Sequence, residues 1–173
     1  MIHKSIIIPV SFVDDKPRFL TVRDRRFKEW IFITGGCRKR EYNNPLKCAI
    51  RELEEETRGV LNIKEGRYSG FSFQYGEDVT YNVYILITSY NRETQSDIVK
   101  QFNIRKQQSD ERKRMNQRIK RVHDENDYLC FETLEVFNKK PRWSMIVTHI
   151  INNPEFYIAL NSPEREDFNM LCN

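Results

Sequence analysis

The sequence lacks the features that mark membrane-spanning and secreted proteins. No apolar run approaches the roughly 20 residues that a membrane-spanning helix needs, and the N-terminus shows no small-residue cleavage site. We therefore expect neither a membrane anchor nor a signal peptide. The four cysteines form no C-x-x-C pair, which predicts reduced thiols in a cytosolic or nuclear protein. Two of them, Cys37 and Cys48, are expected to be small packing residues.

The composition predicts one folded domain. The chain has 173 residues, of which 39% are hydrophobic and 12% aromatic. That apolar content is enough for a core, so wholesale disorder is excluded. We expect a single domain over residues 1–160 and a loose C-terminal tail over 161–173.

Alternating and periodic patterns predict a mixture of strands and helices. Pro45 begins a helical pattern that ends near Gly59, where a left-handed C-cap fits a glycine. Residues 141–152 also have helix-like spacing. The predicted strands are 5–12, 18–22, 30–33, 68–75 and 79–88, with shorter strand or turn segments at 128–131 and 134–137.

Residues 92–124 differ from the rest in charge. This stretch holds ten basic and five acidic residues, a surplus of about five positive charges. It predicts one or two polar helices inserted into a compact α/β core. Such a surface can follow an RNA backbone through phosphate contacts, although a solvated helical face has the same composition. The predicted RNA-binding residues are Lys113, Arg114, Arg118, Lys120 and Arg121.

The run R-E-L-E-E-E at residues 51–56 carries the chemistry. The helical period places Glu52, Glu55 and Glu56 on one face. At helical spacing, each pair of these carboxylates repels by roughly 3 kcal/mol. Clustered carboxylates without cysteine or histidine partners suit a hard cation, Mg²⁺ or Mn²⁺. A solvated acidic face is the alternative from this run alone.

The surroundings of this run resemble the signature of a known family. Gly35, Glu41 and residues 51–56 resemble the Nudix box, whose consensus is G-x5-E-x7-R-E-U-x-E-E-x-G-U, with U a bulky aliphatic residue. Nine residues rather than seven separate Glu41 from Arg51, and the closing glycine comes one residue late, at Gly59. These departures leave the role of Glu41 open, whereas the three helix glutamates match the pattern.

The resemblance implies a Nudix-type α/β/α sandwich with a mixed sheet, and a metal-dependent pyrophosphohydrolase. Glu52, Glu55 and Glu56 would hold Mg²⁺ or Mn²⁺, and Arg51 would orient them by ion pairing. Glu125 is a possible general base by its position before a strand, although an ordinary acidic loop residue fits the same place. The implied substrate-binding residues are Gly35, Gly36, Arg38, Lys39 and Arg40.

The segments 30–38 and 44–59 are also similar to Nudix proteins of large cytoplasmic DNA viruses, a group that includes mRNA-decapping enzymes. This similarity and the basic stretch predict cleavage of a 5′ cap to release m⁷GDP, in the cytoplasm, or the host cytoplasm if the protein is viral. The alternatives are small nucleoside diphosphate derivatives (ADP-ribose, dinucleotides, oxidised nucleoside triphosphates or inositol pyrophosphates), or a non-catalytic binding module. The sequence leaves the oligomeric state open.

Overall fold

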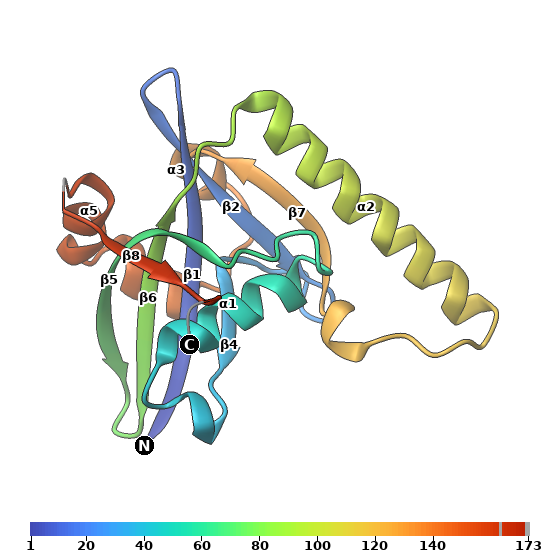
Figure 1. Ribbon diagram of the computed structural model, residues 1–173, viewed down its shortest axis with the longest axis horizontal. Helices are drawn as coiled ribbons and strands as arrows, with labels where there is room; N and C mark the ends of the chain where they lie inside the picture. The colour runs from blue at the N-terminus through green and yellow to red at the C-terminus, as the bar shows by residue number, and fades with distance from the viewer. Residues whose placement is uncertain (163, 172–173) are drawn as a thin grey trace.

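The computed structural model describes residues 1–162 and 164–171, and it contains one eight-stranded mixed sheet with helices on both sides (Figure 1). The strands are β1 (Ile2–Val13), β2 (Lys16–Asp24), β3 (Trp30–Ile31), β4 (Ile33–Gly36), β5 (Glu65–Tyr75), β6 (Val79–Ile87), β7 (Asn126–Glu132) and β8 (Glu166–Asn169). The helices are α1 (Pro45–Glu56), α2 (Arg92–Arg114), α3 (Leu134–Phe137), α4 (Ser144–Ile151) and α5 (Pro154–Asn161), with short 3₁₀ turns η1 (Lys39–Glu41) and η2 (Arg121–His123).

Strand β1 lies in the middle of the sheet and pairs with three other strands. The order is β3-β2-β1-β6-β5-β8, with β4 also paired to β1 and β7 to β2. β1 pairs in parallel with β6, and it pairs antiparallel with β4 near its start (Ile6 opposite Thr34) and with β2 near its end (Val10 opposite Phe19). One edge of β1 therefore pairs with two strands, with β4 near the start of β1 and with β2 near its end.

Both faces of the central strands are covered, as in a three-layer sandwich. Ile6, Ile7 and Ile8 are all buried, and such an unbroken apolar run is typical of a strand that is covered on both faces. The Ser5 hydroxyl donates to the Pro45 carbonyl at 2.8 Å, which joins β1 to α1. In Figure 1, α1 crosses in front of the sheet and the C-terminal helices lie behind it. The predicted α/β/α fold class is confirmed.

The helical pattern that begins at Pro45 forms α1. Proline occupies the first turn, where its missing N–H costs nothing, and an apolar stripe faces the sheet. Beyond the last helical residue, Arg58 and Gly59 both have positive φ, 58° and 77°. Gly59 tolerates this backbone conformation easily, whereas Arg58 adopts it at a cost. Buried residues of the stripe are Leu46, Ala49, Ile50 and Leu53.

The inserted basic stretch forms one long α-helix followed by η2. α2 has 23 residues, and its N-cap Asn91 accepts a hydrogen bond from the Thr94 N–H at 2.8 Å. Its buried residues are Gln95, Ile98 and Phe102, near its N-terminal half. α2 runs alongside β7, at the edge of the sheet (Figure 1). The prediction of one or two polar helices is therefore correct in kind.

Three expectations about the C-terminal third need correction. Residues 134–137 are the one-turn helix α3, capped by the Thr133 side chain, rather than a strand or turn. Residues 141–152 contribute the shorter helix α4, and a separate helix α5 follows it. The expected loose tail contains β8, in which Phe168 pairs with Gly66 of β5. Within the described residues no helix has the length and apolarity to span a membrane, and Cys172 lies outside them.

Candidate active site

The three α1 glutamates lie against the loop that follows β4. Glu52 and Glu56 are each 7% exposed, whereas Glu55 is partly exposed. A Cβ atom on Gly35 would lie 1.9 Å from Glu52 Cδ, so this position requires glycine for the carboxylate to fit. Gly36 has no such neighbour, and it contributes instead its carbonyl, which accepts a hydrogen bond from Arg51 Nη2 at 3.0 Å. Gly35 therefore leaves room for the Glu52 carboxylate, whereas Gly36 provides a hydrogen-bond acceptor for Arg51.

Arg51 joins the acidic residues of the helix and the loop. Its Nη1 donates to Glu52 Oε1 at 2.7 Å and to Glu55 Oε2 at 3.0 Å. Its Nε and Nη2 donate to the two carboxylate oxygens of Glu41 at 2.8 and 3.0 Å. Such paired hydrogen bonds fix the guanidinium plane, so Arg51 sets the position of the Glu52 and Glu55 carboxylates.

Glu41 is the residue whose role the sequence left open. Glu41 ends the 3₁₀ turn η1, and its carboxylate accepts hydrogen bonds from the Arg38 N–H at 2.8 Å and from Arg51. The side chain is buried. Hydrogen bonds from Arg51 outweigh the effect of burial and lower the pKa of Glu41 to about 2. The x5 spacing from Gly35 was the sequence feature that pointed to Glu41.

The pKa values of Glu52 and Glu56 on the helix, and of the nearby Glu125, are shifted in the opposite direction, upward. Burial, reinforced by the negative charge of Glu52, raises the pKa of Glu56 well above its usual value. Burial also raises the pKa of Glu52 to about 7, against the lowering effect of Arg51. Burial and then the charge of Glu55 raise the pKa of Glu125. Asn126 Nδ2 donates to Glu56 Oε2 at 3.2 Å.

This donor set fits a hard divalent cation. The groups are carboxylate oxygens, which Mg²⁺ and Mn²⁺ prefer, and burial raises the pKa values of Glu52 and Glu56, which a bound cation would lower again. Glu52, Glu55 and Glu56 are therefore the residues that would hold the metal. Glu125 faces the same cluster from the chain just before β7, where it can take a proton from a water molecule.

A cavity of about 550 Å³ opens beside these carboxylates. Its acidic wall includes Glu56 and Glu125, and its aromatic wall includes Phe27 and Trp143. The backbone N–H of Trp143 donates to the Trp30 carbonyl of β3 at 3.0 Å, which fixes the main chain of Trp143 beside the sheet. The other lining residues are Asp24, Glu29, Ile31, Thr34, Asn126 and Ser144.

Comparisons with known proteins agree with this architecture. The profile of the NUDIX domain matches residues 1–125. The chain belongs to the Nudix family. No curated protein matches the chain. The match covers the β-sheet core and α1 with its three glutamates, and it identifies the protein as a Nudix pyrophosphohydrolase.

Solved Nudix structures share the fold at low sequence identity. The NUDIX domain of Shewanella oneidensis NrtR, solved in complex with ADP ribose, has a TM-score of 0.50 at 10% identity, over 84% of this chain and 82% of that one. The M. smegmatis Nudix hydrolase RenU has a TM-score of 0.52 at 8% identity, over 88% of each chain. A C. elegans Ap4A hydrolase has a TM-score of 0.47 at 13% identity, over 86% and 91%.

The basic loop of this Nudix protein is only partly directed at the site. Arg38 Nη2 lies 3.6 Å from Glu55 Oε1, so it faces the acidic cluster. Lys39 is exposed on η1. Arg40 lines a different hollow of about 360 Å³, together with Lys47, Glu54 and the ion pair of Glu41 and Arg51, but with none of the three predicted metal ligands. The structure thus brings Arg38, but not Arg40, to the predicted metal ligands.

The predicted RNA-binding residues of the Nudix chain lie at the far end of α2 and in the segment after it. Lys113 forms an ion pair with Asp124. Arg114 lines a hollow of about 540 Å³ with Lys106 and Tyr128. The remaining three are exposed: Arg118, Lys120 and Arg121. None of the five lines the cavity beside Glu56, as far as the described residues show.

Sequence reasoning missed the aromatic wall of the cavity. Phe27 follows β2 and Trp143 precedes α4, so the two are far apart in the sequence. The Asp24 side chain accepts from the Phe27 N–H at 2.6 Å, and this contact fixes the turn. The available sequence feature was an aromatic residue within the charged segment 23–29, after a predicted strand; in the structure Phe27 is 65% exposed.

Proposed function

We propose that the protein hydrolyses the diphosphate bond of small nucleoside diphosphate derivatives. The cavity beside α1 carries this proposal, because it combines an aromatic wall with a carboxylate wall. A nucleobase can stack on Trp143 or Phe27, which places its diphosphate beside Glu56 and Glu125. A volume of about 550 Å³ is in the range of small-molecule sites.

The charges of the cavity favour a base that donates hydrogen bonds. Asp24 and Glu29 line the same cavity as Trp143, and a carboxylate accepts hydrogen bonds without donating any. Purines offer amino and imino donors at their edges. The same carboxylates repel phosphates, so the phosphates would lie toward the α1 cluster, where bound cations offset their charge.

The residues around the cluster have distinct tasks in this proposal. A bound Mg²⁺ or Mn²⁺ would neutralise phosphoryl oxygens and lower the pKa of the attacking water. Arg51 keeps the Glu52 and Glu55 carboxylates in place through hydrogen bonds. Glu125 accepts the proton of that water at its carboxylate, for which a raised pKa is favourable.

A substrate panel tests the proposal. ADP-ribose, a diadenosine polyphosphate and cap-labelled RNA would each be incubated with Mg²⁺ or Mn²⁺, with Glu55→Gln as the blank and chromatographic product analysis as the readout. We expect turnover of a small nucleotide, absent in the blank, and a raised KM in Trp143→Ala. ADP-ribose belongs in the panel because the NrtR domain was solved with it. No turnover of any substrate would contradict the proposal and favour a binding module.

Capped RNA is the second candidate, supported by a basic hollow on the opposite side of the α1 C-terminus. This hollow of about 390 Å³ has Arg58, Arg105, Arg112 and His123 in its lining. It could receive backbone phosphates beyond the cap. The similarity to decapping enzymes of large cytoplasmic DNA viruses and a cytoplasmic location belong to this candidate.

Salt dependence and charge removal separate the two candidates. For capped RNA, we expect release of m⁷GDP whose rate falls steeply with salt, and a further fall when Arg118, Lys120 and Arg121 are replaced by alanine. ADP-ribose turnover should respond to neither change. If the triple variant left decapping unchanged, the exposed basic residues of segment 118–121 would not contact the RNA.

A further inference from the structure

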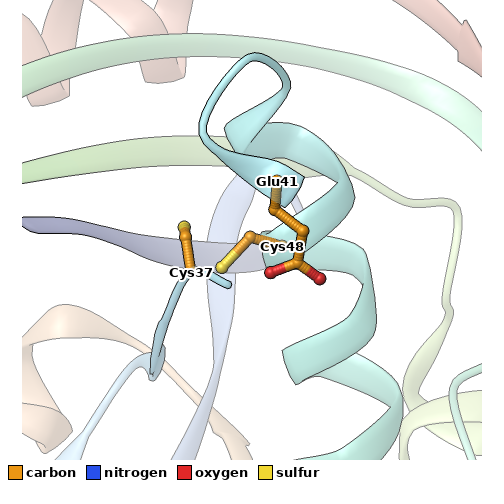
Figure 2. A group of neighbouring side chains, drawn as sticks. All are labelled: Cys37, Glu41 and Cys48. Carbon is orange, nitrogen blue, oxygen red and sulfur yellow. The ribbon is translucent and has the colours of Figure 1, made fainter. Parts of the chain in front are cut away.

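Two cysteines and the ion-paired glutamate of the loop lie close together, next to but apart from the three helix glutamates. Cys37 follows β4, Glu41 ends η1 and Cys48 lies on α1; one ligand atom of each lies within 4.8 Å of the others. Figure 2 shows the three side chains arranged around a common space between the loop and the first turns of α1. From the sequence, both cysteines are expected to be small packing residues.

The dimensions of this cluster approach those of a zinc site. Zn²⁺ lies about 2.3 Å from thiolate sulfur and about 2.0–2.2 Å from a carboxylate oxygen, so two ligand atoms in a tetrahedral site are about 3.6–3.8 Å apart. The three ligand atoms lie within 4.8 Å of one another, so an inward movement of the side chains by up to about 1 Å would complete the site. Cys37 is partly exposed, which gives an ion a path to the cluster.

The chemistry of the donors also selects against the metals of the hydrolytic site. Thiolates are soft ligands, which suit Zn²⁺ and similar ions, whereas Mg²⁺ and Mn²⁺ prefer oxygen. Hydrogen bonds from the Cys48 thiol and from Ser5 lower the pKa of Cys37. The proximity of Cys37 and burial raise the pKa of Cys48. A cation between the two sulfurs would relieve the repulsion that opposes a second thiolate.

We propose that Cys37, Glu41 and Cys48 bind one Zn²⁺ ion, separate from the oxygen-only cluster of Glu52, Glu55 and Glu56. Three protein ligands leave a fourth tetrahedral position for water. Ser5 Oγ lies 3.2 Å from Cys37 Sγ and can support that ligand from the second layer of contacts.

Occupancy of this site would act on the active site through Arg51. The Glu41 carboxylate is held by Arg51, and Arg51 Nη2 lies 3.8 Å from Cys48 Sγ. A zinc ion would compete with the guanidinium for Glu41 and repel its charge. Arg51 would then hold Glu52 and Glu55 less firmly, so Zn²⁺ is expected to inhibit hydrolysis that Mg²⁺ supports.

Cobalt absorption spectroscopy tests the binding site without any reliance on turnover. Co²⁺ bound to thiolates gives a charge-transfer band in the near ultraviolet, which carboxylate ligands do not give. All proteins would carry Cys172→Ser. We expect the band to saturate at a single equivalent, to disappear on addition of Zn²⁺ and to persist in Glu56→Gln. Loss of turnover with the band intact would contradict only the proposed function.

Cysteine variants decide whether this cluster produces the band. Cys37→Ser should abolish it. Cys130→Ser is the matched control, because that partly buried thiol contacts Thr21 and Lys140 elsewhere in the fold; it should keep the band. Absence of the band in the reduced starting protein, or its survival in Cys37→Ser, would overturn the proposal.

Protection of the Cys37 thiol from alkylation provides a second measurement, which does not depend on the folding of a Cys37 variant. Zn²⁺ should slow the alkylation of Cys37 by a maleimide severalfold, as measured by mass spectrometry of the digested protein, and Mg²⁺ should not. Equal rates with and without Zn²⁺ would also overturn the proposal. A Cys37–Cys48 disulfide that forms under reducing conditions would have the same consequence, because it removes both sulfur ligands.

Discussion

Two groups of buried acids differ in how their charge is balanced. Glu41 and Asp127 have arginine or lysine partners, and their pKa values are lowered to about 2. The helix acids Glu52 and Glu56 have raised pKa values because burial outweighs their partners. The first group is neutralised by basic side chains of the protein, whereas burial outweighs the partners of the second. This difference is why we propose the second group, and not the first, as ligands of the hydrolytic cation.

The largest expected effect comes from removing one of the helix acids. Glu56→Gln should lower kcat by about a thousandfold, because it removes both a metal ligand and negative charge at the point of phosphoryl transfer. The matched control is Glu54→Gln, on the same helix but lining the hollow on its other side. Steady-state kinetics with the preferred substrate would measure both. Similar losses in the two variants would contradict the assignment of Glu56.

Changing the neutralised group should have a smaller effect that acts through its neighbours. Glu41→Gln should lower activity by about 10- to 100-fold, as is typical when an orienting contact of a metal ligand is lost. Arg51→Lys should cost at least as much, because Arg51 also donates to Glu52 and Glu55. The double variant should cost little more than Arg51→Lys alone, because Glu41 acts through its contact with Arg51. Fully additive losses would show that Glu41 acts independently of Arg51.

Added metal should stabilise the folded protein through the helix acids. Saturation with Mg²⁺ at a hundred times its Kd should raise the free energy of unfolding by about 2.7 kcal/mol. Urea titrations with and without Mg²⁺ would measure the gain in wild-type protein and in Glu56→Gln. The gain should fall sharply in the variant. An equal gain in both proteins would place the cation elsewhere.

The ion pairs of Asp127, a member of the neutralised group, should make the stability of the fold depend on pH in the acidic range. Asp127 accepts hydrogen bonds from Arg23 and Lys28 at 2.6–2.9 Å, and these outweigh burial and lower its pKa from 3.8 to about 2. Because the pKa of Asp127 is lower in the folded protein than in the unfolded chain, the ionised carboxylate stabilises the fold at pH values above the pKa of the unfolded chain. This stability is lost as the pH falls from about 4 to about 2. In urea titrations at pH 7 and pH 3, Asp127→Asn should lose about 2 kcal/mol at pH 7 and less at pH 3. A loss independent of pH would indicate a packing defect.

The same comparison shows why some of the site could be predicted from the sequence. Glu52, Glu55 and Glu56 lie within five consecutive residues, so helical periodicity alone places them on one face. Their position beside Gly35 follows from the strand–loop–helix order. Arg51, by contrast, has a partner across the loop, and the position of Glu41 depends on a 3₁₀ turn that no periodic pattern announces.

Other parts could not be predicted because their structure depends on distant contacts. The four residues of α3 are too few for a helical period to be visible, and Thr133 rather than an apolar pattern starts the turn. β8 has a buried Phe168 because β5 provides a free edge. The cavity wall combines Phe27 and Trp143, which are brought together by the sheet and not by local sequence.

The division of β1 between β4 and β2 has a consequence for how the protein folds. Each partner of β1 beyond the adjacent hairpin comes from far along the chain: Ile33 faces Ile7 across one edge, and Tyr84 faces Ile7 across the other. Folding must therefore close long loops before these pairings form, which slows it. α1 lies inside the loop between β1 and β6. During refolding, hydrolytic activity should consequently return in the same slow phase as tryptophan fluorescence, with no earlier active species.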